Sequence, residues 1–195
     1  MKALAKNWLR MLADRRGLAA TEFAFIMPVM LVMFFGTVEF SSGVAVDRKV
    51  TLMARTLSDL TSQSTSVTDA DIANFFLASN WIMWPYSTSA PNPNPVAPLS
   101  GTITELYVDP TTLQARVQWS KGTAPRTTSA VVAIPSALAV AGTYLIYSEV
   151  SYNYVPTVGY VMAKAGITLS DFAYTRPRQS TCVLLNATTG SCPTS

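Results

Sequence analysis

One acidic residue, Glu22, lies where an ionised side chain is costly. It follows Gly17 by five residues, at the point where an apolar run of membrane length begins. A lone charge in a bilayer is unfavourable unless it reaches the interface or finds a partner, so such a residue is by default a candidate functional site. The chemistry open to this carboxylate is an ion pair, and the rest of the chain has to supply the cation.

The composition excludes several kinds of active site. The 195 residues include no histidine, which removes a Ser-His-Asp triad, a Cys-His pair and imidazole ligation of a metal. The sequence also lacks Gly-rich phosphate loops, Cys-x-x-Cys motifs and paired carboxylates spaced as metal ligands. We therefore expect no catalytic residues, no metal site and no cofactor.

The only two cysteines lie close together near the end of the chain. Cys182 and Cys192 fall in a tail rich in Thr, Asn and Gly. Such a pair is typical of a small disulfide loop formed in an oxidising compartment. We predict that disulfide, and the alternative is two unpaired thiols.

Charge is concentrated at the N-terminus. Before residue 18 the chain carries +4, from Lys2, Lys6, Arg10, Arg15 and Arg16 against Asp14. Since the whole chain carries +3, the remaining residues carry −1. A nucleic-acid-binding domain needs a basic face, so we expect no nucleic-acid partner. Only 13% of the residues are charged, well below the roughly 25% of soluble globular proteins, which favours a membrane or an assembly surface.

The apolar run predicts a single transmembrane helix. No charge lies between Phe23 and Val38, and with the apolar flanks 18–20 and 40–46 the run reaches the ~20 residues that a spanning helix needs. The basic N-terminal side predicts that residues 1–17 lie in the cytoplasm and the C-terminal bulk outside the inner (cytoplasmic) membrane. Residues 18–46 are expected to contact lipid, and apolar residues at helical spacing extend the helix over 18–60.

Two simpler explanations of this apolar run are a secretory signal peptide and an uncleaved signal anchor. A secretory signal peptide is opposed by the long basic segment, by Glu22 and Glu39, and by the lack of a clean small-x-small cleavage site. An uncleaved signal anchor explains the run and its orientation. It does not explain Gly17 and Glu22.

Two sets of residues carry a family resemblance. Arg15-Arg16-Gly17 followed by Leu18 to Phe23 resembles a type IV prepilin processing site, in which a peptidase cuts after the glycine and glutamate is fifth in the mature chain. More narrowly, Glu22-Phe23-Ala24, Pro28, Gly36 and Glu39-Phe40 resemble the TadE/TadG-like pseudopilin family of tight-adherence (Flp-type) pilus systems. Later in the chain, Tyr152-x-Tyr154-x-Pro156 and Arg176-Pro177-Arg178 are similar to the ends of these chains.

The resemblance implies a role for each residue of the motif. A prepilin peptidase would cut between Gly17 and Leu18, with Arg15 and Arg16 as the leader's basic residues. The new α-amino group, largely positive at neutral pH, would pair with Glu22 of an adjacent subunit and set the register of packed helices. Other pilin or pseudopilin subunits and the pilus assembly platform are the implied partners.

Pro28 lies inside the apolar run. Proline lacks an N–H and kinks a helix interior, a defect that membranes tolerate when neighbours satisfy the freed carbonyl. We therefore expect a helix kink at Pro28.

Residues 61–195 are expected to form an exported α+β head. Thr68 and Asp71 resemble a capping box that opens a short helix through about Ser79, and Trp81, Met83 and Trp84 are expected to pack in a core. The proline-rich residues 91–98 predict a stiff loop. Strand patterns cover 102–108, 113–120, 145–154 and 168–174, with a short helix or turn at 134–141, which gives a small antiparallel sheet.

The sequence therefore favours a non-enzymatic structural subunit: a minor pilin or pseudopilin, processed after Gly17, with a cytoplasmic leader at 1–17. The alternative is an uncleaved, signal-anchored exported binding protein. A membrane-tethered Ser-Lys hydrolase is a third reading, for which Lys121 and Lys164 are available, but no motif selects a serine.

Overall fold

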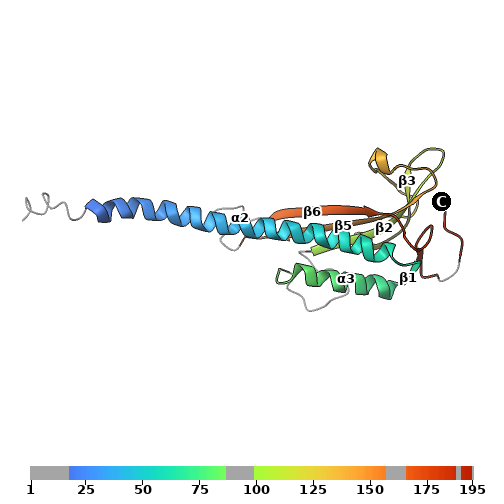
Figure 1. The fold of residues 1–195 in the computed structure, drawn as a ribbon, viewed down its shortest axis with the longest axis horizontal. Helices are drawn as coiled ribbons and strands as arrows, with labels where there is room; N and C mark the ends of the chain where they lie inside the picture. The colour runs from blue at the N-terminus through green and yellow to red at the C-terminus, as the bar shows by residue number, and fades with distance from the viewer. Residues whose placement is uncertain (1–17, 87–98, 157–165, 188–189, 195) are drawn as a thin grey trace, which may run out of the picture.

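The computed structural model describes residues 18–86, 99–156, 166–187 and 190–194. The leader 1–17 and the proline-rich loop 91–98 therefore lie outside the described residues. In the described part, a long apolar helix leads into a head with a curled antiparallel sheet and a second helix (Figure 1). The expected α+β class is confirmed.

Helix α2 (Leu18–Ser62) changes its environment along its length. Its first half is exposed on all sides, whereas Val46, Val50, Met53 and Leu57 in its second half are fully buried. These residues recur at spacings of three and four, which places them on one side of a helix. The second half of α2 is therefore part of the head's core, and the helix extends slightly beyond its predicted end at residue 60.

Helix α3 (Asp69–Met83) starts with the predicted capping box. The Thr68 hydroxyl accepts a hydrogen bond from the Asp71 N–H at 3.2 Å, and the Asp71 carboxylate accepts one from the Thr68 N–H at 2.9 Å. These two bonds satisfy backbone groups that a helix start leaves open. The helix runs four residues past its predicted end at Ser79 and packs along α2.

The sheet has five strands in the order β4-β3-β2-β5-β6, and every neighbouring pair is antiparallel. The strands are β2 (Leu99–Val108), β3 (Ala115–Gly122), β4 (Val131–Val132), β5 (Tyr144–Tyr154) and β6 (Ile167–Thr175), with a 3₁₀ turn at Ser136–Leu138. The four predicted strands and the hairpin between β2 and β3 are confirmed. A separate parallel pair joins β1 (Ser66–Val67) to β7 (Leu184–Leu185).

Both helices cover one face of the sheet. The inward side chains of β5, among them Ile146, Val150, Tyr152 and Tyr154, join Val50 and other α2 residues in one buried cluster. A smaller cluster around Leu106 and Val117 lies on the opposite face, under the segment that contains β4. The head is therefore a two-layer unit in which α2 is one of the core elements.

The expected core position of the tryptophans in α3 is wrong. Met83 is fully buried, but Trp81 is 65% exposed and Trp84 is 63% exposed. The buried stripe of α3 follows Ile72, Phe76 and Met83; Trp81 lies off that stripe and Trp84 follows the last helical residue.

Candidate functional site

The N-terminal end of α2 carries the predicted assembly residues. The helix begins at Leu18, and Glu22 is exposed one turn further along. Residues four apart lie on the same side of a helix. The first backbone nitrogen of the helix and the Glu22 carboxylate therefore share a face, while Arg15, Arg16 and Gly17 lie outside the described residues.

The apolar part of α2 leaves most of its surface uncovered. Phe25 is 81% exposed, Met33 is 68% exposed and Val38 is 49% exposed, and these three side chains point to different sides of the helix. About 20 residues of this uncovered stretch span about 30 Å at ~1.5 Å per residue, as much as the hydrocarbon core of a bilayer. The helix is long and apolar enough to cross a membrane once.

Pro28 lies within this exposed stretch. The helix continues without interruption through Pro28, from Leu18 to Ser62. The kink expected at this proline stays a prediction.

The head first covers α2 at Glu39. This residue is only 4% exposed, and the Tyr154 hydroxyl donates a hydrogen bond to its Oε2 at 3.4 Å. Gly43 lies one turn further along α2, facing the ring of Tyr154. Beside this contact, Phe40, Val44 and Ile167 help to line an apolar hollow of about 220 Å³.

This junction joins two motifs that the sequence shows far apart. Glu39 belongs to the helix motif, and Tyr154 belongs to the Tyr-x-Tyr-x-Pro pattern. The junction also limits the exposed apolar surface of α2: between Glu39 and Val46 the head covers one side of the helix, while Phe40 and Val44 remain exposed.

Lys49 fastens the end of α3 to α2. Its Nζ donates hydrogen bonds to the carbonyl oxygens of Ile82 at 2.8 Å and Trp84 at 2.9 Å, and it lies 5.9 Å from the centre of the Tyr86 ring. Helix C-termini carry unsatisfied carbonyl groups and partial negative charge, both of which favour a cation. Sequence reasoning missed this role, because Lys49 looks like any other charged residue after the apolar run.

The tail is held at the far end of the head by the predicted disulfide. Cys182 and Cys192 are bonded, with their Cα atoms 5.8 Å apart. Next to this bond, Val183 donates its N–H to Glu105 Oε1 at 2.6 Å and accepts a hydrogen bond from Trp119 Nε1 at 2.8 Å. Two core side chains thus hold one tail residue in place.

Glu105 is fully buried in the middle of β2. Burial raises the pKa of its carboxyl group to about 7, although the Val183 N–H and the Trp119 indole act in the opposite direction. Among the residues that the structure describes, no group lies within hydrogen-bond geometry of its second oxygen. The sequence signal for this buried acid is its strand position, two residues after the inward-facing Ile103.

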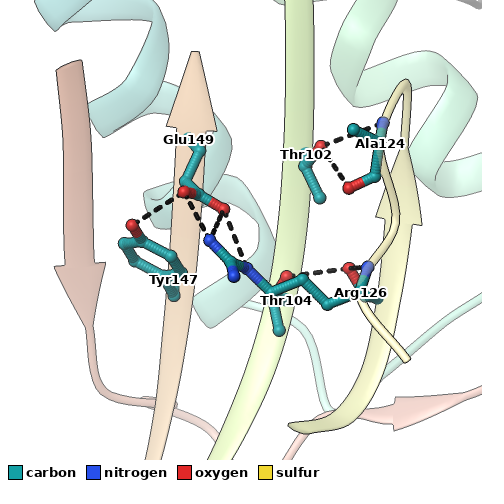
Figure 2. Close-up of polar contacts among 7 residues, drawn as sticks. Thr102, Thr104, Ala124, Arg126, Tyr147 and Glu149 are labelled. Atoms are coloured by element: carbon teal, nitrogen blue, oxygen red, sulfur yellow. Dashed lines mark hydrogen bonds and ion pairs between the residues drawn. The ribbon is translucent and has the colours of Figure 1, made fainter. Parts of the chain in front are cut away.

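The other face of the sheet carries a polar cluster (Figure 2). Arg126 binds both carboxylate oxygens of Glu149 at 2.7 and 2.8 Å through Nη2, and the Tyr147 hydroxyl donates to the same carboxylate at 2.9 Å. Thr102 is hydrogen-bonded to the backbone of Ala124 on the neighbouring loop. A shallow groove of about 450 Å³ follows this cluster towards Phe172 on β6.

The contacts in this cluster favour a structural role. Arg126 also donates its N–H to Ser120 on β3, so its side chain and backbone together tie the loop after β3 to the sheet. No group of acidic residues and cysteines in the described ranges is arranged to hold a metal ion. The most distinctive feature of the molecule is therefore the exposed apolar half of α2.

Comparison with known proteins finds a family match that covers most of this helix. Residues 17–57 match the model of the family described as TadE-like protein. No curated protein and no solved structure matches the chain. The resemblance expected from the sequence is thus confirmed over residues 17–57, which include most of α2 and reach the part of it that lies within the head.

Proposed function

We propose that this chain, whose residues 17–57 are TadE-like, is a minor pilin or pseudopilin: a structural subunit used to build a tight-adherence (Flp-type) pilus. The observation that supports the proposal is that the TadE-like segment overlaps with helix α2. The TadE-like segment covers the half of α2 that is exposed on all sides as well as the half that is buried in the head. A helix with this much apolar surface needs lipid or other helices around it.

The proposed life cycle starts in the inner membrane. The chain crosses it once, with residues 1–17 in the cytoplasm and the head outside, as the basic N-terminus favours. A prepilin peptidase then removes the leader by cutting between Gly17 and Leu18. Support for this step comes from the Arg15-Arg16-Gly17 sequence, followed by Glu22 at the fifth position after the glycine.

Cutting changes the electrostatics of the helix start. A free amino group at Leu18, with a reference pKa near 8, is largely positive at neutral pH. It lies one turn from Glu22 and can pair with the glutamate of a neighbouring, axially shifted helix. Desolvation offsets much of the attraction between buried charges, so the pair sets register more than it adds net stability.

The partners of this subunit are then other pilin or pseudopilin chains and the pilus assembly platform, besides the peptidase. Their contacts are made first through the exposed half of α2. The head, held by a disulfide suited to an oxidising compartment, serves as a structural domain. No enzymatic step is assigned to it.

Two variants test processing and assembly separately. Gly17→Ala should insert normally but remain uncut, whereas Glu22→Gln should be cut before Leu18 yet fail to co-purify with pilus partners. Asp47→Asn is the matched control, because it removes an exposed acid on α2 beyond the apolar run and should leave both steps unchanged. N-terminal sequencing and co-purification are scored on the same membrane samples from a host with the cognate peptidase.

The outcome distinguishes this function from its alternative. Recovery of only full-length wild-type chain would favour an uncleaved, signal-anchored binding protein. Normal cutting and normal co-purification of Glu22→Gln would show that the carboxylate is tolerated but has no role in assembly.

A further inference from the structure

Two tryptophans remain exposed at the end of α3. Trp81 and Trp84 keep 65% and 63% of their surface accessible, while Met83 between them is fully buried. A tryptophan combines a large apolar ring with one N–H donor, and it is enriched where one side of a protein is apolar and the other is wet, above all at membrane interfaces.

The contacts of Lys49 locate this pair along α2. Because Lys49 binds the carbonyl oxygens of both Ile82 and Trp84, the end of α3 lies at the height of Lys49. Asp47 and Arg48, the first exposed charged residues after the apolar run, lie one or two residues before it. The tryptophans therefore lie where α2 changes from an apolar to a charged surface.

The same edge of the head is apolar next to β6. Figure 1 shows that the end of α3 and the start of β6 both reach the edge that faces the free part of α2. Near the start of β6, Val155 is 57% exposed, and Phe40 and Val44 of α2 flank the hollow at Tyr154. This edge, defined by Trp81, Trp84, Val155, Phe40 and Val44, is called the proximal edge below.

The length of α2 places the proximal edge at the bilayer surface. Residues 23–43 span about 30 Å at ~1.5 Å per residue, the thickness of the hydrocarbon core. Headgroups add about 5 to 8 Å on each side, since the whole bilayer measures roughly 40 to 45 Å. Lys49 is six residues past this stretch and so about 9 Å further along the axis, just beyond the headgroup layer, which brings the end of α3 to the outer surface of that layer.

We propose that the proximal edge rests on the lipid headgroup layer, with Trp81 and Trp84 as interfacial anchors, so that the head is held against the membrane that α2 crosses. The inference rests on the proposed membrane span and adds a second, lipid-facing surface to it. Asp47, Arg48 and Lys49 together carry one net positive charge at this height, which favours anionic headgroups below them. Before assembly, the head then has a fixed position over the bilayer.

Tryptophan emission tests this contact in the full chain. The chain has four tryptophans, and Trp8→Phe removes the one in the leader, leaving Trp81, Trp84 and the buried Trp119. The protein is reconstituted in phosphatidylcholine–phosphatidylglycerol vesicles whose acyl chains carry bromine near the glycerol end. We expect bromine to quench the tryptophan emission of the Trp8→Phe protein. We expect this quenching to disappear when Trp81→Phe and Trp84→Phe are added.

A second exposed aromatic residue supplies the control. Phe172 is 56% exposed on β6, five residues past the start of that strand. Phe172→Trp in the variant without Trp8, Trp81 and Trp84 should show no quenching by brominated lipid, because this site is exposed but lies away from the proximal edge. The near-UV circular dichroism signal of the buried Trp119 verifies that each variant is folded.

Integration of the chain is measured on the same vesicles by resistance to alkaline carbonate. Carbonate resistance without quenching of Trp81 and Trp84 would overturn the headgroup contact and leave the membrane span intact. Equal quenching of the Phe172→Trp reporter would also overturn it, since the head would then contact lipid without preference for this edge. Extraction by carbonate would overturn the membrane span and this inference together.

Discussion

Tyr154, the last residue of β5, donates a hydrogen bond to Glu39 of α2, which is only 4% exposed. An acid at the end of the apolar stretch of α2 is thereby removed from the surface of the helix. This contact is also where the exposed and buried halves of α2 meet. It is therefore the part of the head–helix junction nearest to the exposed apolar half of α2.

We expect Tyr154→Phe to loosen that junction. Loss of one hydrogen bond to a buried acceptor costs about 1 to 3 kcal/mol, and the distance of 3.4 Å here favours the low end. Hydrogen exchange of the α2 amides around residues 39–46 should become faster. Tyr152→Phe is the control, because its hydroxyl binds the Tyr86 carbonyl at 3.0 Å instead. Equal effects of both variants on these amides would contradict a specific role for the Glu39 contact.

The stability of the head should depend on pH through Glu105. Its pKa is about 7 in the folded state, against 4.5 for the ordinary carboxyl group. The folded state thus binds more protons between these values, so the contribution of Glu105 to stability is largest below pH 4.5 and is lost as pH rises through about 7. The full loss is about 3 kcal/mol, at 1.36 kcal/mol per unit.

Glu105→Gln should remove that slope. The amide oxygen can still accept the Val183 N–H, so the variant should match wild type near pH 4.5 and be more stable near pH 8. The stability of each protein at the two pH values is measured as the midpoint of thermal unfolding, followed by near-UV circular dichroism in detergent. Asp109→Asn is the control: hydrogen bonds from Thr111 and Thr112 lower the pKa of Asp109 to about 2, so its contribution is constant above pH 4.5 and lost only in stronger acid.

Breaking the disulfide should release the tail before the rest of the head. Cys182 and Cys192 are ten residues apart, and closing such a loop contributes about 3 kcal/mol in the chain-entropy model. Cys182→Ser with Cys192→Ser should lower stability by about that amount and speed exchange at Val183 to Asn186. A thiol assay on unfolded, unreduced wild type should find no free thiol; two would contradict the bond.

Lys49→Met should destabilise the end of α3. Methionine keeps an unbranched apolar stem but leaves the Ile82 and Trp84 carbonyl groups without their cation, at a cost of about 1 to 2 kcal/mol. Arg48→Met removes a neighbouring exposed charge and should have little effect. The midpoints of thermal unfolding of the two variants are compared. A similar loss of stability in both would show that the effect comes from net charge and not from the contacts of Lys49.

Local signals in the sequence predict much of this fold. The apolar run and its helical spacing give α2, the pair Thr68 and Asp71 gives the start of α3, and alternation gives the long strands. The nearby cysteines give the disulfide. Each of these signals depends on residues within a few turns of one another, so no knowledge of tertiary contacts is needed.

The features that were missed depend on distant residues. Simple alternation along β3 would place Val117 and Trp119 on one face of the sheet. In the structure Glu105 pairs with Trp119 and the next residue, Leu106, pairs with Val117, so Gln118 is an extra residue in β3. This bulge sends Trp119 to the helix side, where it binds Val183, and leaves Val117 on the opposite face.

The residues of the candidate site also differ in whether the sequence alone predicts their contacts. The motif around Gly17 and Glu22 can be read from the sequence because its residues are adjacent. The Glu39–Tyr154 contact cannot be read from the sequence, because its two residues are more than a hundred positions apart. It forms only when strand β5 packs beside α2. The exposure of Trp81 and Trp84 was mispredicted, because aromatic residues near a helix end more often pack inward.

The continuity of α2 also has a rotational consequence. One helix carries Glu22 at one end and forms part of the head's core at the other, without a break between them. An α-helix advances by a fixed angle of about 100° per residue, so the direction in which Glu22 points fixes the direction of every surface on the head. In the continuous helix, which runs through Pro28, a neighbour that fixes the azimuth of Glu22 thereby also orients the groove beside Arg126.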